Sequence, residues 1–130
     1  MNTNTPCFEY LVISRGHWDA SASKEDIQRA IDAFYVWHER MVAEGRMKHG
    51  SRLMKDGKSV SRHGVTDGPY TEAKEVIGGY WFVYARSLEE AAQLLAQNPC
   101  LGYGLVNEVR ELDPVPGSAF AVTAETPPRG

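Results

Sequence analysis

The sequence predicts a single α+β domain in which strands and helices alternate along the chain. The chain has 130 residues, of which 42% are hydrophobic and 24% are charged. This length and composition are typical of one globular domain that buries its own core. Some segments are short runs of branched and aromatic residues, which indicate strands, and others repeat their apolar residues at helical spacing.

The first two elements are a strand at residues 8–13 and a long helix. The strand has little polar face, and we therefore expect it to lie in the centre of a sheet. The helix begins after Ser23, which starts a sequence resembling a capping box, and it ends near Gly45. Its apolar face consists of Ile27, Ile31, Phe34, His38 and Met41.

Residues 47–55 and 58–65 are expected to form a β-hairpin around Asp56-Gly57, because an Asp-Gly pair between two strand-like runs is a strong turn signal. In the register of a two-residue turn, Lys55 pairs with Lys58, and His49 and His63 fall on opposite faces. A metal site shared by these two histidines is therefore not expected, unless a bulge shifts the register. We expect the protein to hold no metal and no cofactor.

The same part of the chain is basic. Residues 46–63 contain six lysine or arginine residues and one acidic residue, whereas the whole chain has a net charge of −3. Such charges protect a sheet edge from pairing with another chain, or they bind a small anionic ligand or an acidic partner. The sequence leaves these alternatives open.

The second half of the chain repeats the order of strand, helix and strand. A strand covers residues 76–85, a capping box at Ser87 begins a second helix, and Asn98-Pro99 ends it. A last strand covers residues 104–112. Two βαβ units joined through a hairpin predict a ferredoxin-like sandwich of βαβ-β-βαβ order, with both helices on one face of the sheet.

The other face of this sheet would be bare in a monomer. The strands at residues 8–13 and 80–85 carry large apolar side chains at both alternating positions, so the face away from the helices is apolar as well. Exposed apolar patches of this size usually mark an interface. We therefore expect the chain to form a homodimer through the sheet.

The domain is expected to cover residues 8–112. Residues 1–7 are predicted to be a loose leader, and residues 113–130, which are rich in proline, an irregular tail. No apolar run approaches the ~18 residues that span a bilayer, and no signal-peptide pattern is present, so we expect a cytoplasmic protein without a membrane partner. The net charge and the lack of a recognised motif argue against a nucleic-acid partner.

A family resemblance rests on residues 65–75, which read Val-Thr-Asp-Gly-Pro-Tyr-Thr-Glu-Ala-Lys-Glu and are followed by Gly78-Gly79-Tyr80. This motif resembles the signature of the DGPF branch of the YCII-related proteins, with Tyr70 in place of the usual Phe. The segments at residues 98–100 and 107–110 are similar to later parts of that family. The resemblance covers roughly residues 8–112. It implies a dimeric α+β barrel, in which two ferredoxin-like sheets pack face to face, and it implies no particular activity.

One departure from the family concerns catalysis. Some YCII relatives have a histidine on the first helix and an Asp-Pro after the second helix, a pair proposed to be catalytic. In this chain the second position is Asn98, which cannot ionise. His38 lies on the first helix but does not securely match the family histidine. The resemblance therefore implies no catalytic pair here.

The candidate catalytic residues are His38, His49 and Asp67. The candidate ligand-binding residues are Asp67, Tyr70, Lys74 and His38. A histidine can act as a pocket acid or base near neutral pH, but His38 is equally explained as a core histidine held by one hydrogen bond. Asp67 either caps the turn at Gly68-Pro69 or forms the polar wall of a cleft.

Two functions fit these observations. The first is a small dimeric accessory protein that binds a small ligand or a protein partner, which is favoured by the lack of an identifiable nucleophile and by Asn98. The alternative is a small acid/base enzyme whose pocket is formed by a histidine and the Asp-Gly-Pro loop at residues 67–69. The sequence favours the first function slightly and does not decide whether the chain is catalytic.

Overall fold

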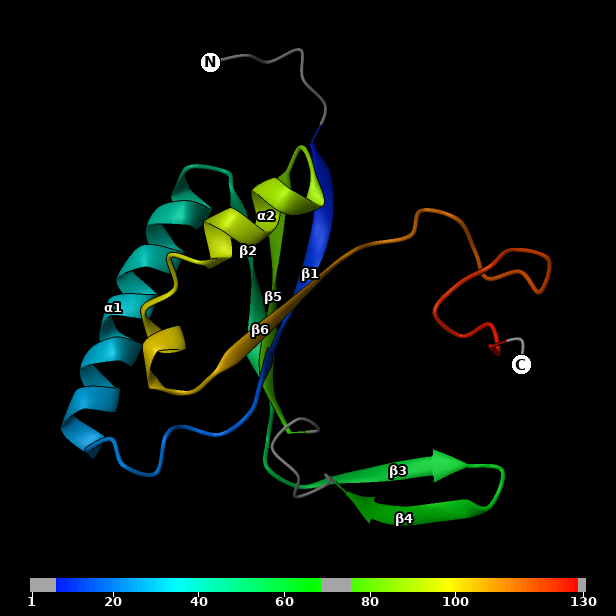
Figure 1. The fold of residues 1–130 in the computed structure, drawn as a ribbon, viewed down its shortest axis with the longest axis horizontal. Helices are drawn as coiled ribbons and strands as arrows, with labels where there is room; N and C mark the ends of the chain where they lie inside the picture. Colours follow the sequence, from blue (N-terminus) through cyan, green and yellow to red (C-terminus); the bar gives the residue numbers. More distant parts are fainter. Residues whose placement is uncertain (1–6, 69–75, 129–130) are drawn as a thin grey trace.

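The computed structural model describes residues 7–68 and 76–128, and its elements alternate as the sequence predicts (Figure 1). The elements are β1 (Phe8–Arg15), α1 (Lys24–Ala43), β2 (Met47–Arg52), β3 (Gly57–Ser61), β4 (Gly64–Gly68), β5 (Ile77–Ala85), α2 (Leu88–Leu95), the 3₁₀ helix η2 (Pro99–Tyr103) and β6 (Val106–Glu111).

Four strands form the main sheet in the order β2-β5-β1-β6, and every neighbouring pair is antiparallel. The two strands of each βαβ unit therefore run in the same direction, with one strand of the other unit between them. Both helices lie on one face of this sheet (Figure 1). The predicted α+β ferredoxin-like fold is confirmed, and β1 is a central strand as expected.

Helix α1 begins and ends where its sequence signals predict. The Ser23 side chain accepts a hydrogen bond of 3.0 Å from the backbone N–H of Asp26, which satisfies one of the free donors of the first turn. At the other end, Gly45 has a φ of 76°. The N–H groups of Gly45 and Arg46 donate to the carbonyls of Val42 and Met41, a Schellman arrangement that needs a residue tolerant of positive φ.

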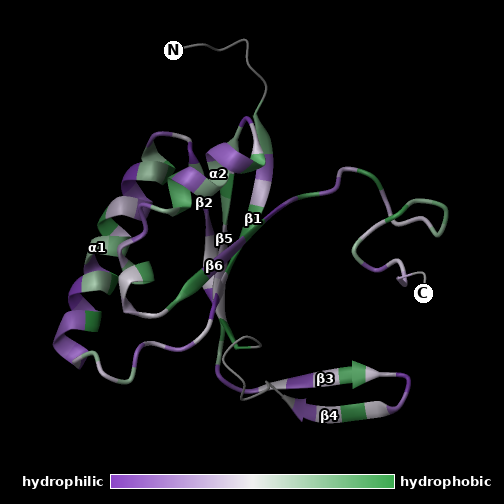
Figure 2. Cartoon of the chain, in the orientation of Figure 1, coloured by the Kyte–Doolittle hydropathy of each residue, from purple (hydrophilic) through white to green (hydrophobic). Residues whose placement is uncertain are grey.

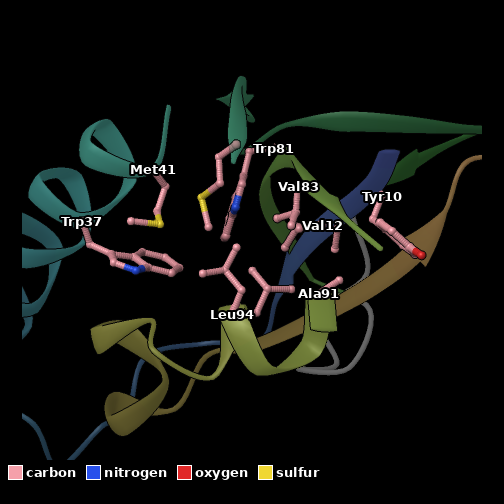
Figure 3. Close-up of a cluster of buried hydrophobic side chains, with 11 residues drawn as sticks. Tyr10, Val12, Trp37, Met41, Trp81, Val83, Ala91 and Leu94 are labelled. Carbon is pink, nitrogen blue, oxygen red and sulfur yellow. The ribbon is translucent and has the colours of Figure 1, made fainter. Parts of the chain in front are cut away.

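The core lies between the helices and one face of the sheet (Figure 3). On β5 the burial alternates strictly, so that every second residue from Gly79 to Ala85 faces the helices and is buried. The residues between them are half-buried on the opposite face. The buried cluster consists of Tyr10, Val12, Trp37, Met41, Met47, Trp81, Val83, Ala85, Ala91, Leu94 and Leu95.

The hairpin predicted around Asp56-Gly57 is wrong. Instead, β2 joins the edge of the main sheet, where Met47 lies opposite Val83 of β5. Met47 is thereby buried, a gain that pairing with the polar residues 58–65 would not provide. The hairpin is formed by β3 and β4, with Arg62-His63 at its turn and Gly64, at φ 118°, next to it.

This pairing also changes the argument about the histidines. His49 belongs to β2 of the main sheet, whereas His63 lies in the turn of the separate β3–β4 hairpin. Lys58 pairs with Asp67 and not with Lys55. The expectation that the two histidines occupy opposite faces of one hairpin is therefore wrong, because they lie in different sheets.

The chain after β6 forms turns, without a helix or strand, as far as residue 128. Phe120 and Val122, two apolar side chains of this segment, are 100% and 89% exposed. Within the described residues, no helix combines the length and the apolar character that crossing a membrane requires.

Gly50 provides a test of how β2 docks on β5. It lies where the pairing of these strands shifts, and a Cβ there would overlap the Tyr80 carbonyl oxygen and stand 2.7 Å from the Trp81 Cα. Because both obstacles are backbone atoms, Gly50→Ala should lower the free energy of unfolding by about 2–3 kcal/mol, as measured by urea denaturation. The control is Gly102→Ala, whose added Cβ would meet no atom within 4 Å. Equal stability of the two variants would contradict this view of the strand pairing.

Candidate functional site

A pocket of 540 Å³ lies between α1 and the end of the main sheet. Its floor comes from the last residues of β2 and the first residues of β5, and its walls from α1, the loop after β1 and η2. Gly79 of β5 lets the two strands approach closely, since a Cβ there would lie 2.9 Å from the Ser51 carbonyl oxygen. The lining includes Trp18, Phe34, Tyr35, His38, His49, Arg52, Tyr80, Trp81, Asn98 and Cys100.

His38 is both a core residue and a wall of this pocket. It is only 5% exposed, and its ring stacks on Phe34 with a centroid distance of 5.4 Å. The Nδ1 atom lies 3.3 Å from the sulfur of Met47, and Nε2 makes no hydrogen bond to the described residues. Burial lowers the pKa of His38, the charge of His49 lowers it further, and Glu39 partly opposes both effects. The imidazole is therefore neutral at pH 7.

His49 is hydrogen-bonded to Glu39 at the edge of the pocket. The His49 Nε2 contacts a carboxylate oxygen of Glu39, and the two rings of His49 and His38 meet edge to face at 5.3 Å. The hydrogen bond from His49 lowers the pKa of Glu39, which is therefore a carboxylate at neutral pH. Sequence analysis identified His49 but missed Glu39, because a single exposed glutamate on a helix carries no signal of its own.

Arg52 is the second residue that sequence analysis missed as a pocket residue. It lies at the end of β2, opposite Gly79, and lines the pocket. Its guanidinium makes no hydrogen bond or ion pair with any residue that the structure describes. The only signal in the sequence was its membership of the basic run at residues 46–63, which did not distinguish it from the other five cations.

Asn98 has a structural role at the position where some relatives have an acid. It is buried, and its Oδ1 accepts the N–H of Cys100 at 2.9 Å while its Nδ2 donates to Asn107 at 2.8 Å. It thereby caps η2 and ties it to β6. Burial raises the pKa of the Cys100 thiol to about 11, so this thiol is protonated and a poor nucleophile at neutral pH.

Asp67 does not lie with the histidines. Its carboxylate pairs with Lys58 across the β3–β4 hairpin, its side chain is 88% exposed, and it does not line the pocket. Tyr70 and Lys74, the other predicted ligand-binding residues, lie outside the described residues, as does the rest of the Asp-Gly-Pro loop beyond Gly68. Among the residues described, no group of three or more His, Cys, Asp or Glu side chains is placed to hold a metal ion.

Comparison with known proteins gives the family. The model of the YCII-related domain matches residues 9–113. The chain belongs to the YCII-related family. The match does not distinguish the DGPF branch from the rest of this family.

Other comparisons add little to the family match. No curated protein matches the sequence. One solved structure with a similar fold is the 5-chloro-2-hydroxyhydroquinone dehydrochlorinase of Burkholderia phenoliruptrix, in complex with 2,5-dihydroxybenzoquinone. The two chains share 16% identity with a TM-score of 0.44, over 81% of this chain and 93% of the other. This likeness is too distant to carry an argument about activity.

The buried His38 should make the stability of the protein depend on pH. An unperturbed histidine titrates near 6.5, and the pKa of His38 is lowered in the folded state. Below pH 6.5 the unfolded chain therefore binds more protons than the folded one, and stability falls as the pH drops towards the folded pKa. We expect His38→Gln to lose less stability than the wild type between pH 7.5 and 5.5 in urea denaturation.

The control for this comparison is His63→Gln, which removes an exposed histidine from the hairpin turn. This variant should retain the pH dependence of the wild type. An equal loss of stability in His38→Gln and the wild type would show that His38 is not the group responsible.

Proposed function

We propose that this YCII-related protein is a homodimer that binds a small anionic ligand in the pocket beside α1. The observation that carries the proposal is the position of Arg52. Its guanidinium is permanently charged, it lines the pocket, and it has no acidic partner among the described residues. A guanidinium recognises a carboxylate or phosphate through two parallel hydrogen bonds, which gives both affinity and orientation. The same cation would repel a positively charged ligand.

The rest of the pocket supports a small and partly apolar ligand. Its volume of 540 Å³ falls within the range of about 300–1,000 Å³ that is common for small-molecule sites. Trp18, Phe34 and Tyr35 contribute aromatic surface, and His38 contributes a neutral imidazole whose Nε2 has no partner within the described residues. These groups suit a ligand with an apolar body and one acidic group.

The uncovered face of the main sheet supports the homodimer. It carries the half-buried side chains Leu11, Ile13, Tyr80, Phe82 and Tyr84. Paired charges lie among these apolar side chains. Lys48, whose ammonium lies 4.4 Å from the centre of the Phe82 ring, binds Glu9 at 2.6 Å across β5, and Arg15 binds Glu108. Aromatic side chains together with paired charges are compatible with a protein interface, whose centre is enriched in aromatic residues.

A second candidate function is acid/base catalysis in the same pocket. The observation that favours it is the pair of His49 and Glu39, because a carboxylate that binds one ring nitrogen orients the imidazole. Asp67 has no part in this arrangement, in contrast to the pocket expected from the sequence. A catalytic role would make turnover depend on His49, whereas ligand binding alone would depend on Arg52.

The charge preference of the pocket can be measured with benzoate and benzamide, which differ chiefly in charge. We expect benzoate to shift the NMR signals of pocket residues at millimolar concentration and benzamide to bind at least about tenfold more weakly. Arg52→Gln should remove this preference, because it deletes the cation and keeps a polar side chain. Arg46→Gln removes a cation outside the pocket and should leave the preference intact. Equal binding of the two compounds by the wild type would refute an anion site.

The proposed dimer can be tested by size-exclusion chromatography with light scattering. The wild type should have about twice the mass of the 14.5 kDa chain at micromolar concentration. Phe82→Asp should convert it to a folded monomer, because it places a charge in the centre of the apolar band. The control is Val36→Asp on the outer face of α1, where the side chain is 68% exposed. A monomeric wild type would contradict the dimer.

A further inference from the structure

The hairpin of β3 and β4, residues 57–68, stands apart from the rest of the fold. It forms a sheet of its own and has no extensive contact with any other described helix or strand. We call it the β3–β4 arm. It leaves the domain between β2 and β5 and extends to the side of the main sheet that lies opposite the helices (Figure 1). An isolated two-stranded hairpin is only marginally stable in water, and the described part of the chain gives the arm little support.

The two faces of the arm differ in chemistry. On one face Val60 and Val65 are paired across the strands, and they are 77% and 64% exposed. The ion pair of Lys58 and Asp67 lies on the same face, one step nearer to the domain. The opposite face carries only Gly, Ser and Thr side chains, at positions 57, 59, 61, 64, 66 and 68. Figure 2 shows the apolar residue on each strand of the arm between more polar segments.

The direction of the arm indicates what covers the two valines. Because the arm extends beyond the uncovered face of the main sheet, any molecule that packs on that face must lie beside the arm. We propose that this molecule is a second copy of the chain and that the arm of each subunit clasps the other subunit through Val60 and Val65. This inference rests on the homodimer of the proposed function.

Symmetry explains why a second copy suits the arm. In a two-fold dimer both subunits present the same surface, so each arm reaches its partner in an equivalent way and both valine pairs are covered. The clasp would also hold the pocket wall in place, because Arg52 and Gly78, which flank the arm in the sequence, line the pocket.

The test compares the dimer dissociation constants of three proteins by sedimentation equilibrium. Val60→Asp with Val65→Asp should weaken the dimer by at least about tenfold, because two charges replace the apolar contact. The matched control is Ser59→Asp with Thr66→Asp, a neighbouring cross-strand pair on the opposite face of the arm. This control adds the same charge to the same two strands and should change the constant by no more than about twofold.

A second measurement observes the arm without altering it. The backbone N–H groups of residues 57–68 should exchange with deuterium more slowly in the wild-type dimer than in the Phe82→Asp monomer. A dimer that is unaffected by the valine substitutions, or an arm that exchanges equally fast in both proteins, would overturn the clasp and leave the homodimer intact. A monomeric wild type would overturn both.

Discussion

The whole structure depends on the way β5 presents two different apolar faces. One face packs Trp81, Val83 and Ala85 against the helices, where they are almost fully buried. The other presents Tyr80, Phe82 and Tyr84 to the uncovered side of the sheet. A strand with both faces apolar has to be covered on both sides, and the helices that the structure describes cover only one side. The bare face is therefore the physical basis of the proposed dimer.

The pocket lies where the tight packing around β5 ends. Towards α2 the space between helices and sheet is filled by leucine, valine and alanine side chains, as Figure 3 shows. Towards the start of β5, glycines replace the large side chains, and the sheet leaves room for a ligand. The His38 ring lies at the boundary of these regions, since its Nδ1 contacts Met47 of the core and the ring lines the pocket together with Phe34. Substitutions of His38 should therefore affect the core and the pocket together.

The polar groups around the pocket support two different candidate functions. His49 and Glu39 are hydrogen-bonded and resemble an acid/base pair, whereas the charge of Arg52 is not compensated by any described residue. Anion binding would use Arg52, and acid/base catalysis would use His49 and Glu39. Strand β2 connects the pocket to the proposed interface, because it carries Lys48 on the uncovered face and Arg52 in the pocket.

The sequence by itself determined the elements that local signals specify. The Ser23 and Ser87 caps, the Gly45 stop and the apolar runs of β1 and β5 act within a few residues, so their positions could be predicted from the chain alone. Only the tertiary structure decided the partners of β2 and β3. The Asp-Gly pair at Asp56 is a local turn preference. The burial of Met47 against β5, a contact between residues far apart in the chain, outweighs it.

The candidate site follows the same division. His38 and His49 were identified from residue type and helical spacing, which are properties of the sequence. The pairing of Glu39 with His49 and the position of Arg52 on the pocket wall arise only when β2 docks beside α1 and β5. Asp67 was predicted to line the pocket because it belongs to a family motif. In the structure it lies on the separate β3–β4 hairpin, where it pairs with Lys58 and not with the histidines. Local preference thus determined which residues form each element, and long-range burial decided which of their side chains meet.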